Sequence, residues 1–271
     1  MRTRTKLVKG LRLNFDHFRS GRIGILLIHG NSSSKNAFAK QIAALVEIGL
    51  SVVVPDLPGH GASERSRTPK KTYSFPGYAD VLHDLMVELG YNAYHILGWS
   101  LGGHIGLEML SRLSTVQSVL LTGTPPVSLN PDGVAAGFNW TPSTALAGRR
   151  RFSSDDVVRY VSAMMGSRRP SVEHLDAATA TDGNARFWMV RNGLSGIGAD
   201  EVQVVTSDSR PLAIVQGAAD PFVNIGYLRK LPYKNIWRGA PILVEDVGHA
   251  PHWQSAAIFN RHMQEFFKHA H

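Results

Sequence analysis

The amino-acid sequence predicts an α/β protein with a mostly parallel sheet flanked by helices. Short apolar runs, typical of strands buried on both faces, alternate with longer segments whose apolar residues recur at helical spacing. The expected strands are an amino-terminal hairpin of Thr5–Val8 and Leu11–Phe15, followed by Ile23–Ile28, Val52–Val54, Tyr94–Leu97, Val119–Thr122, Leu212–Val215 and Ile242–Val244. The expected helices are Ala37–Ile48, Tyr78–Leu89, Leu101–Leu113 and Ala256–Lys268.

One long interval, residues 125–210, breaks this alternation. It has no clear strand run and is too long for a plain loop. Asp155–Met165 and Ala185–Arg191 have helical patterns, and Ser153 or Ser154 is suited to cap the first. The interval begins and ends at the carboxyl edge of the predicted sheet, where ligands bind. We therefore expect a core of residues 1–124 and 211–271, with residues 125–210 as a helical cap over the site.

The composition excludes several classes of site and partner. The chain has no cysteine, so disulfides, thiolate catalysis and cysteine-based metal sites are excluded. The net charge is +8, but the basic residues are scattered and match no RNA-binding or helix-turn-helix pattern, which favours a solvated basic surface over nucleic-acid binding. No run approaches the roughly 20 apolar residues of a membrane helix, and no signal peptide is recognisable. We expect a cytoplasmic protein without membrane or nucleic-acid partners, as a monomer or small homo-oligomer.

The segment from Ile96 to His104 carries the strongest functional signal. It is predicted to run from a strand through a sharp turn at Ser100 into a helix, with Gly98 and Gly102 two residues to either side of the serine. The five-residue pattern alone is common in chains of this composition, so the flanking strand and helix carry the prediction. Such a turn exposes the Ser100 hydroxyl above a helix amino terminus, as a nucleophile requires.

A serine nucleophile needs a histidine base, and the base needs a carboxylate that orients it. Asp220 follows the expected strand Leu212–Val215, and His249 follows Ile242–Val244, so both should lie at the same sheet edge as Ser100. The order of serine, acid and histidine along the chain is the one used by hydrolases of this sheet type. We predict Ser100, Asp220 and His249 as the catalytic residues.

Other histidines and acids are less suited to these roles. His252 is a weaker candidate for the base, and Asp246 is expected to face elsewhere because it lies at the end of the strand itself. His104 should pack or contact the cap, and His60 should have a structural role in its turn. Asp220 precedes a proline, which is also common in plain turns.

Acyl transfer also needs donors for the developing oxyanion. The backbone N–H of Leu101 follows the nucleophile at a helix amino terminus, and the backbone N–H of Asn31 in the loop after the strand Ile23–Ile28 is the predicted second donor. Ser32 is the weaker alternative. The same loop is also suited to cap a helix through Ser33 or Ser34.

With these residues identified, the chain resembles the α/β-hydrolase superfamily over nearly its full length. It looks most like the metal-independent N-acyl-homoserine lactonases of that fold. The stretches that carry the likeness are His29–Ser34, Asp56–Gly61, Gly98–Gly106, Thr122–Val127 and Ala145–Gly148, of which the third and fourth are the more discriminating.

The resemblance implies Ser100 as nucleophile, His249 as base and Asn31 at the oxyanion position. It also implies a cap tyrosine that contacts a substrate carbonyl, and the matching segment Phe152–Tyr160 makes Tyr160 the candidate, with ordinary cap packing as the alternative. The chain departs from that group at Asp220, where a glutamate is usual, although both acids serve in such triads. The distal cap, residues 164–198, matches only loosely, which leaves the substrate open.

The predicted function is a serine hydrolase that opens the lactone ring of N-acyl homoserine lactones, the reaction of quorum quenching, with no metal or organic cofactor. The alternatives are a general carboxylesterase, a C–C bond hydrolase and a non-catalytic ligand receptor. A dehalogenase is disfavoured because its nucleophile would be a carboxylate. The apolar cap residues either line an acyl channel or only pack the cap; these are Met164, Met165, Phe187, Trp188 and Met189.

Overall fold

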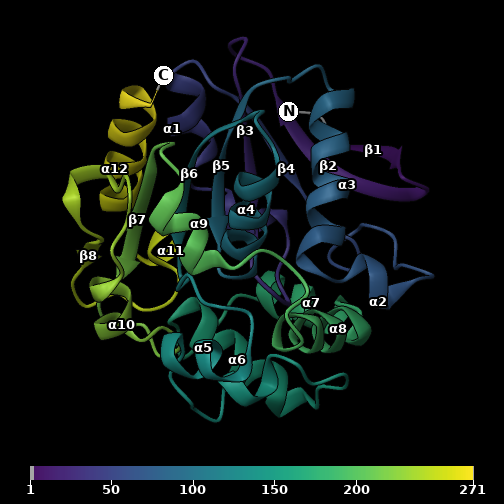
Figure 1. The fold of residues 1–271 in the computed structure, drawn as a ribbon. Helices are drawn as coiled ribbons and strands as arrows, with labels where there is room; N and C mark the ends of the chain where they lie inside the picture. The colour runs from purple at the N-terminus through teal and green to yellow at the C-terminus, as the bar shows by residue number, and fades with distance from the viewer. Residues whose placement is uncertain (1–2, 271) are drawn as a thin grey trace.

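The computed structural model describes residues 3–270, which form an α/β protein built on one eight-stranded sheet (Figure 1). The strand order is β1-β2-β4-β3-β5-β6-β7-β8. The first three strands in this order pair antiparallel, and all later pairs are parallel. The strands are β1 (Thr3–Val8), β2 (Leu11–Phe18), β3 (Gly24–Ile28), β4 (Ser51–Pro55), β5 (Tyr94–Trp99), β6 (Val116–Thr122), β7 (Leu212–Gly217) and β8 (Ile242–Val244).

The central strands are buried on both faces, which is why their sequences are continuously apolar. Along β3, Leu26 and Ile28 face one hydrophobic core, while Ile25 and Leu27 face the other. The helices α3 (Phe75–Glu88), α4 (Leu101–Arg112) and α9 (Glu201–Ser207) contribute to the first core. The helices α1 (Ile42–Glu47) and α12 (Ala256–His269) contribute to the second. The predicted two-sided sheet is confirmed.

One predicted helix, Ala37–Ile48, is wrong as a single element. A 3₁₀ turn, η1 (Lys35–Phe38), is followed by a break before α1. The backbone N–H of Gln41 bonds the carbonyl of Phe38, three residues back, and the buried Gln41 side chain donates to the carbonyl of His252. This tie to the carboxy-terminal segment, which the local pattern does not contain, fixes the chain in the tighter turn.

The chain between β6 and β7 forms helical segments that gather at one end of the sheet, with α9 returning beside α4 (Figure 1). The predicted helices at 155–165 and 185–191 correspond to α6 and α8, and Ser153 caps α6 in a reciprocal pair with Asp156. The position of these helices at one end of the sheet is consistent with a cap. Its boundaries at residues 125 and 210 stay a prediction. The segments are α5 (Pro131–Gly137), η2 (Thr144–Leu146), α6 (Ser154–Met165), α7 (Val172–Ala180), α8 (Gly183–Leu194) and α9.

The remaining elements are short and lie in the connections. Within residues 3–270, no helix combines the length and apolar character needed to cross a membrane. The short elements are α2 (Pro69–Thr72), α10 (Ile225–Lys230), η3 (Trp237–Gly239) and α11 (Pro251–Gln254).

Candidate active site

Ser100 occupies a strained turn between β5 and α4. Its φ of 53° with ψ of −119° is a conformation that a residue with a side chain rarely adopts. The turn closes only because its neighbours are glycines: a Cβ at Gly98 would lie 2.5 Å from the carbonyl oxygen of Gly102, and one at Gly102 would lie 1.8 Å from that of Ile28. The Ser100 N–H donates to the carbonyl of Thr122, which anchors the turn to the adjacent strand.

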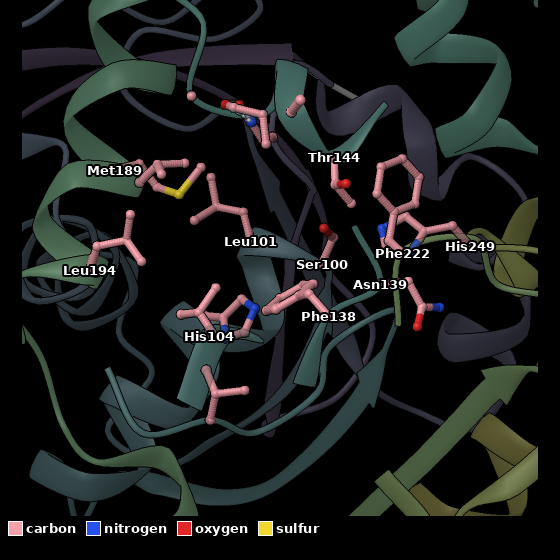
Figure 2. Close-up of a pocket in the computed structure, with 18 of the residues that line it drawn as sticks. Ser100, Leu101, His104, Phe138, Asn139, Thr144, Met189, Leu194, Phe222 and His249 are labelled. Atoms are coloured by element: carbon pink, nitrogen blue, oxygen red, sulfur yellow. Dashed lines mark hydrogen bonds between the residues drawn. The ribbon is translucent and has the colours of Figure 1, made fainter. Parts of the chain in front are cut away.

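Asp220 and His249 form a buried hydrogen-bonded pair beside this turn. The Nδ1 of His249 lies 2.8 Å from Oδ2 of Asp220. The other ring nitrogen, Nε2, is buried and has no hydrogen-bond partner within residues 3–270. His249 and Ser100 line the same cavity (Figure 2). The pair therefore presents an imidazole nitrogen that can accept a proton inside the cavity.

The surroundings of Asp220 keep its carboxylate ionised. Its Oδ1 accepts hydrogen bonds from the backbone N–H groups of Phe222 and Val223, and Gln216 donates to Oδ2 at 2.6 Å. Burial acts to raise the pKa of Asp220, but the charge of His249 and these hydrogen bonds outweigh it and hold the pKa below its ordinary value. An ionised Asp220 can fix the imidazole with its hydrogen on Nδ1.

Packing fixes the position of the His249 ring. The indole nitrogen of Trp99 donates to the His249 carbonyl at 2.9 Å, and the ring of Phe222 lies 4.6 Å from the imidazole, measured between centroids. Gly123, at a φ of 64°, passes so close that a Cβ there would lie 2.9 Å from Cε1 of His249. The backbone just after β6 therefore leaves room for the imidazole only because residue 123 is glycine.

The two predicted oxyanion residues both line the cavity with Ser100. Leu101 is the first residue of α4. The side chain of Asn31 is engaged elsewhere, since Nδ2 donates to the carbonyl of Ala147 at 2.9 Å and to the Tyr160 hydroxyl at 3.3 Å. Ser34 precedes η1 without a side-chain capping bond, so the capping alternative fails for that residue. The donor roles of the Leu101 and Asn31 N–H groups stay predictions.

Tyr160 reaches the cavity from α6 and is almost fully buried. Its hydroxyl accepts the hydrogen bond from Asn31, so its own hydrogen remains available as a donor. Burial raises the pKa of Tyr160 to about 12, which keeps the phenol protonated at neutral pH. Its ring packs between Phe152 and Phe222, at centroid distances of 5.5 and 6.2 Å.

The cavity has a volume of about 290 Å³ and a mostly apolar wall (Figure 2). Of the predicted channel residues, Met164 and Met189 line it, whereas Met165, Phe187 and Trp188 do not. The correction follows from helix geometry, because successive residues on α8 point about 100° apart. Other apolar wall residues are Phe75, Leu101, Val127, Leu129, Val134, Phe138, Leu194 and Phe222.

The competing residues lie in other surroundings than the pair of His249 and Asp220. The His252 ring is buried against Trp99, and burial lowers its pKa to about 3. Asp246 is exposed, and the Nδ1 of His60 lies 3.1 Å from the Pro58 carbonyl. His104 contacts the inserted segment, since its Nδ1 lies 2.8 Å from Oε1 of Glu201 on α9.

Sequence reasoning missed Gln216 and Glu201. Gln216 is the only polar side chain of the run Leu212–Gly217, and that exception was a usable signal. Its Oε1 accepts from the Gly123 N–H while its amide holds Asp220. Glu201 had no local signal, because its partner His104 is 97 positions away in the sequence.

The comparisons with known proteins agree with this geometry. A family model described as the alpha/beta hydrolase fold matches residues 25–256. The crystal structures of N-acyl homoserine lactonase AidH, one with N-butanoyl homoserine and one of a mutant with N-hexanoyl homoserine lactone, superpose with a TM-score of 0.94 at 34% identity. Those alignments cover 100% of this chain and 97% and 98% of the AidH chains.

Two curated relatives are more distant. A non-heme chloroperoxidase of Kitasatospora aureofaciens is 29% identical, with 80% of each chain covered. A pimeloyl-[acyl-carrier protein] methyl ester esterase of Aromatoleum aromaticum is 27% identical, with 85% of this chain and 92% of the esterase covered. With its family match, its sheet and its esterase and lactonase relatives, the chain belongs to the α/β hydrolase family and is a hydrolase that acts on ester bonds.

Proposed function

We propose that this protein opens the lactone ring of N-acyl homoserine lactones through a triad of Ser100, His249 and Asp220. The observation that carries the proposal is one apolar cavity that holds the Ser100 turn, the free Nε2 of His249 and the protonated Tyr160 hydroxyl together. The likeness to AidH, solved with an N-acyl homoserine lactone, supports the substrate class.

In the first step, the Ser100 oxygen attacks the ring carbonyl while Nε2 of His249 takes the hydroxyl proton. The backbone N–H groups of Leu101 and Asn31 hold the oxyanion. When the carbon–oxygen bond of the ring breaks, the imidazolium returns the proton to the departing ring oxygen. That oxygen becomes an alcohol in the same molecule, because a lactone carries its leaving group within the ring.

In the second step, His249 removes a proton from water, and the resulting hydroxide attacks the ester on Ser100. The bond to the Ser100 oxygen breaks, the serine regains its hydrogen from His249, and the N-acyl homoserine leaves as a carboxylic acid that ionises in water. Asp220 stabilises the imidazolium in both steps. The low pKa of Asp220 suits this role because the carboxylate is charged whenever the imidazolium forms.

The cavity provides distinct places for the parts of the substrate. Tyr160 donates its hydroxyl hydrogen to the acyl amide carbonyl, and the apolar wall around Phe138, Met189 and Leu194 holds the acyl chain. Ring opening destroys the lactone, so the activity fits quorum quenching. We include in the proposal that the enzyme uses no metal or organic cofactor and acts in the cytoplasm.

A general carboxylesterase is the second candidate. The pimeloyl ester esterase among its relatives favours it, and an apolar cavity accepts other acyl groups. The two functions use the same catalytic residues. They differ in whether the site prefers a lactone, whose leaving alcohol stays attached to the acyl part, over a linear ester, whose alcohol departs as a separate molecule.

A substrate panel separates the two. The rates for N-butanoyl and N-hexanoyl homoserine lactone are compared with those for linear esters of the same acyl length, using wild type, Ser100→Ala and the matched control Ser111→Ala on the exposed end of α4. We expect preference for the lactones, loss of all turnover in Ser100→Ala and wild-type rates in Ser111→Ala. Equal or higher rates on linear esters would favour the carboxylesterase.

A further inference from the structure

A second histidine–carboxylate pair lies in the cavity wall and has no part in the reaction described above. His104 is on α4, one turn after Ser100, and its Nδ1 lies 2.8 and 2.9 Å from the two carboxylate oxygens of Glu201. Glu201 is only 1% exposed, and its Oε2 also accepts a hydrogen bond from the backbone N–H of Val127 at 2.9 Å. This pair joins the core helix α4 to the inserted segment.

The proton between the two groups belongs to His104. Oε2 of Glu201 already accepts the Val127 N–H, and both carboxylate oxygens lie within 2.9 Å of Nδ1, so Glu201 is the acceptor and Nδ1 of His104 is the donor. A neutral imidazole with its hydrogen on Nδ1 has a bare lone pair on Nε2. No hydrogen bond from residues 3–270 reaches this Nε2, and His104 lines the cavity (Figure 2).

Apart from Glu201, the side chains that contact His104 are apolar, so its Nε2 is an isolated acceptor in this part of the cavity wall. The imidazole stacks on Phe75 at a centroid distance of 5.5 Å and an interplanar angle of 11°, and Phe138 lies 5.8 Å away. An acceptor in such a wall stabilises a bound donor, and a substrate that buries it without a donor binds less well. The pair is therefore suited to select a substrate by a hydrogen-bond donor on its acyl chain.

The position along the chain follows from helix geometry. The N–H of His104 bonds the Ser100 carbonyl four residues back at 3.3 Å, so the two side chains leave the same face about 6 Å apart at their Cβ atoms. Consecutive Cα atoms are three bonds and about 3.8 Å apart, so 6 Å corresponds to about five bonds of an extended chain. Five bonds from a lactone carbonyl carbon held at Ser100 lead to carbon 3 of the acyl chain.

We propose that His104, positioned by Glu201, determines specificity by accepting a hydrogen bond from a hydroxyl on carbon 3 of the acyl chain. This inference rests on the proposed lactonase function. A 3-oxo group would place its oxygen lone pairs against the lone pair of Nε2, and an unsubstituted chain would offer no donor. The expected order of preference is therefore 3-hydroxyacyl first, unsubstituted second and 3-oxoacyl last.

The test measures kcat and KM of the full chain for N-hexanoyl, N-3-hydroxyhexanoyl and N-3-oxohexanoyl homoserine lactone at one fixed pH. Calorimetry with Ser100→Ala measures the Kd of each intact lactone. One hydrogen bond is worth about 0.5–1.5 kcal/mol, so we expect the 3-hydroxy lactone to exceed the 3-oxo lactone by about tenfold in kcat/KM, mainly through KM.

Glu201→Gln provides the sharpest variant. The Val127 N–H can only donate, so it selects the glutamine oxygen and leaves the amide NH₂ facing Nδ1 of His104. The NH₂ at the position of Oε1, 2.8 Å from Nδ1, then favours the tautomer with its hydrogen on Nε2, which turns the acceptor into a donor. We expect the ratio of 3-oxo to 3-hydroxy kcat/KM to rise by about tenfold over wild type. His104→Phe should remove the discrimination in both directions.

The control His83→Phe removes a half-buried histidine of α3 that does not line the cavity, and it should keep the wild-type ratio. Ratios measured within one variant do not depend on the folded fraction of that variant. A wild type that treats the three lactones alike, or a Glu201→Gln ratio equal to wild type, would overturn the inference while leaving the lactonase intact. Failure to hydrolyse or bind any of the lactones would overturn the proposed function together with it.

Discussion

The two histidine–carboxylate pairs at this cavity both have a ring Nδ1 2.8 Å from a carboxylate oxygen, but their carboxylates come from different parts of the chain. His249 and Asp220 both follow core strands at the same sheet edge, whereas Glu201 reaches His104 from the segment inserted between β6 and β7. The first pair has its buried Nε2 at a cavity that Ser100 also lines, and the second has its Nε2 among apolar side chains. Under the two proposals above, the same chemical unit would serve catalysis at the sheet edge and substrate selection under the inserted segment.

Removal of Ser100 or His249, the proposed nucleophile and base, should have the largest effect. Ser100→Ala and His249→Ala should each reduce kcat by roughly 10⁴-fold or more, and the double variant should be little worse, because the residues act as a unit. Steady-state kinetics with an N-acyl homoserine lactone measures this loss, and circular dichroism checks the fold. Near-normal turnover by either folded variant would contradict the triad assignment.

Changing only the acid comes next. In Asp220→Asn, the N–H groups of Phe222 and Val223 select the amide oxygen, so the NH₂ faces Nδ1 of His249 and favours the wrong tautomer. We expect kcat to fall by about 10³- to 10⁴-fold. Asp220→Glu keeps the charge and should be far milder. The control is Asp246→Asn, which changes an exposed residue of a turn. An active Asp220→Asn together with an inactive Asp246→Asn would show that Asp220 is not the acid of the triad.

A glycine comparison tests how tightly the core fixes the base. Gly123 and Gly10 both have a positive φ, but a Cβ at Gly123 would press on the His249 ring, while one at Gly10 would meet no atom of residues 3–270 within 4 Å. Both alanine variants should lose about 1–2 kcal/mol of unfolding free energy from backbone strain. Only Gly123→Ala should also lose kcat, by about 10²-fold, because the imidazole is displaced. Equal kcat values for the two variants would show that the close approach at Gly123 does not position the base.

The smallest expected change in kcat/KM comes from a substitution in the inserted segment. Tyr160→Phe removes the hydroxyl and keeps the packing against Phe152 and Phe222. The loss of one hydrogen bond to the acyl carbonyl should reduce kcat/KM on acyl homoserine lactones by up to about tenfold. The effect should shrink for p-nitrophenyl acetate, which is too short to engage Tyr160. An equal effect on both substrates, or none on either, would leave Tyr160 as a packing residue.

The difference between the two pairs also explains what the sequence could predict. Strand ends in a parallel sheet meet at one edge, so the positions of Ser100, Asp220 and His249 after their strands were enough to place them together. The break between η1 and α1 depends on Gln41 bonding a carbonyl 211 positions away, and the pairing of His104 with Glu201 depends on how the insert folds back onto α4. Such contacts leave no periodic pattern in the sequence.

In the inserted segment, too, the sequence pattern predicts the helices but not which of their side chains face the cavity. Its helices α6 and α8 follow from their patterns and from the Ser153 cap. Which of their apolar residues face the cavity depends on the rotation of each helix, and that is why Met189 lines the cavity whereas Phe187 and Trp188 do not. Phe187 instead packs under the Arg150 guanidinium, 3.7 Å from its ring centroid.

The most direct test of the central claim is the mass of the enzyme quenched during turnover of N-hexanoyl homoserine lactone. Attack by Ser100 on a lactone keeps the leaving alcohol attached, so the adduct should have the mass of the whole substrate and map to the peptide that contains Ser100. The account predicts this adduct in wild type and its absence in Ser100→Ala. The same adduct in Ser100→Ala, or its location on another residue while turnover continues, would contradict the account.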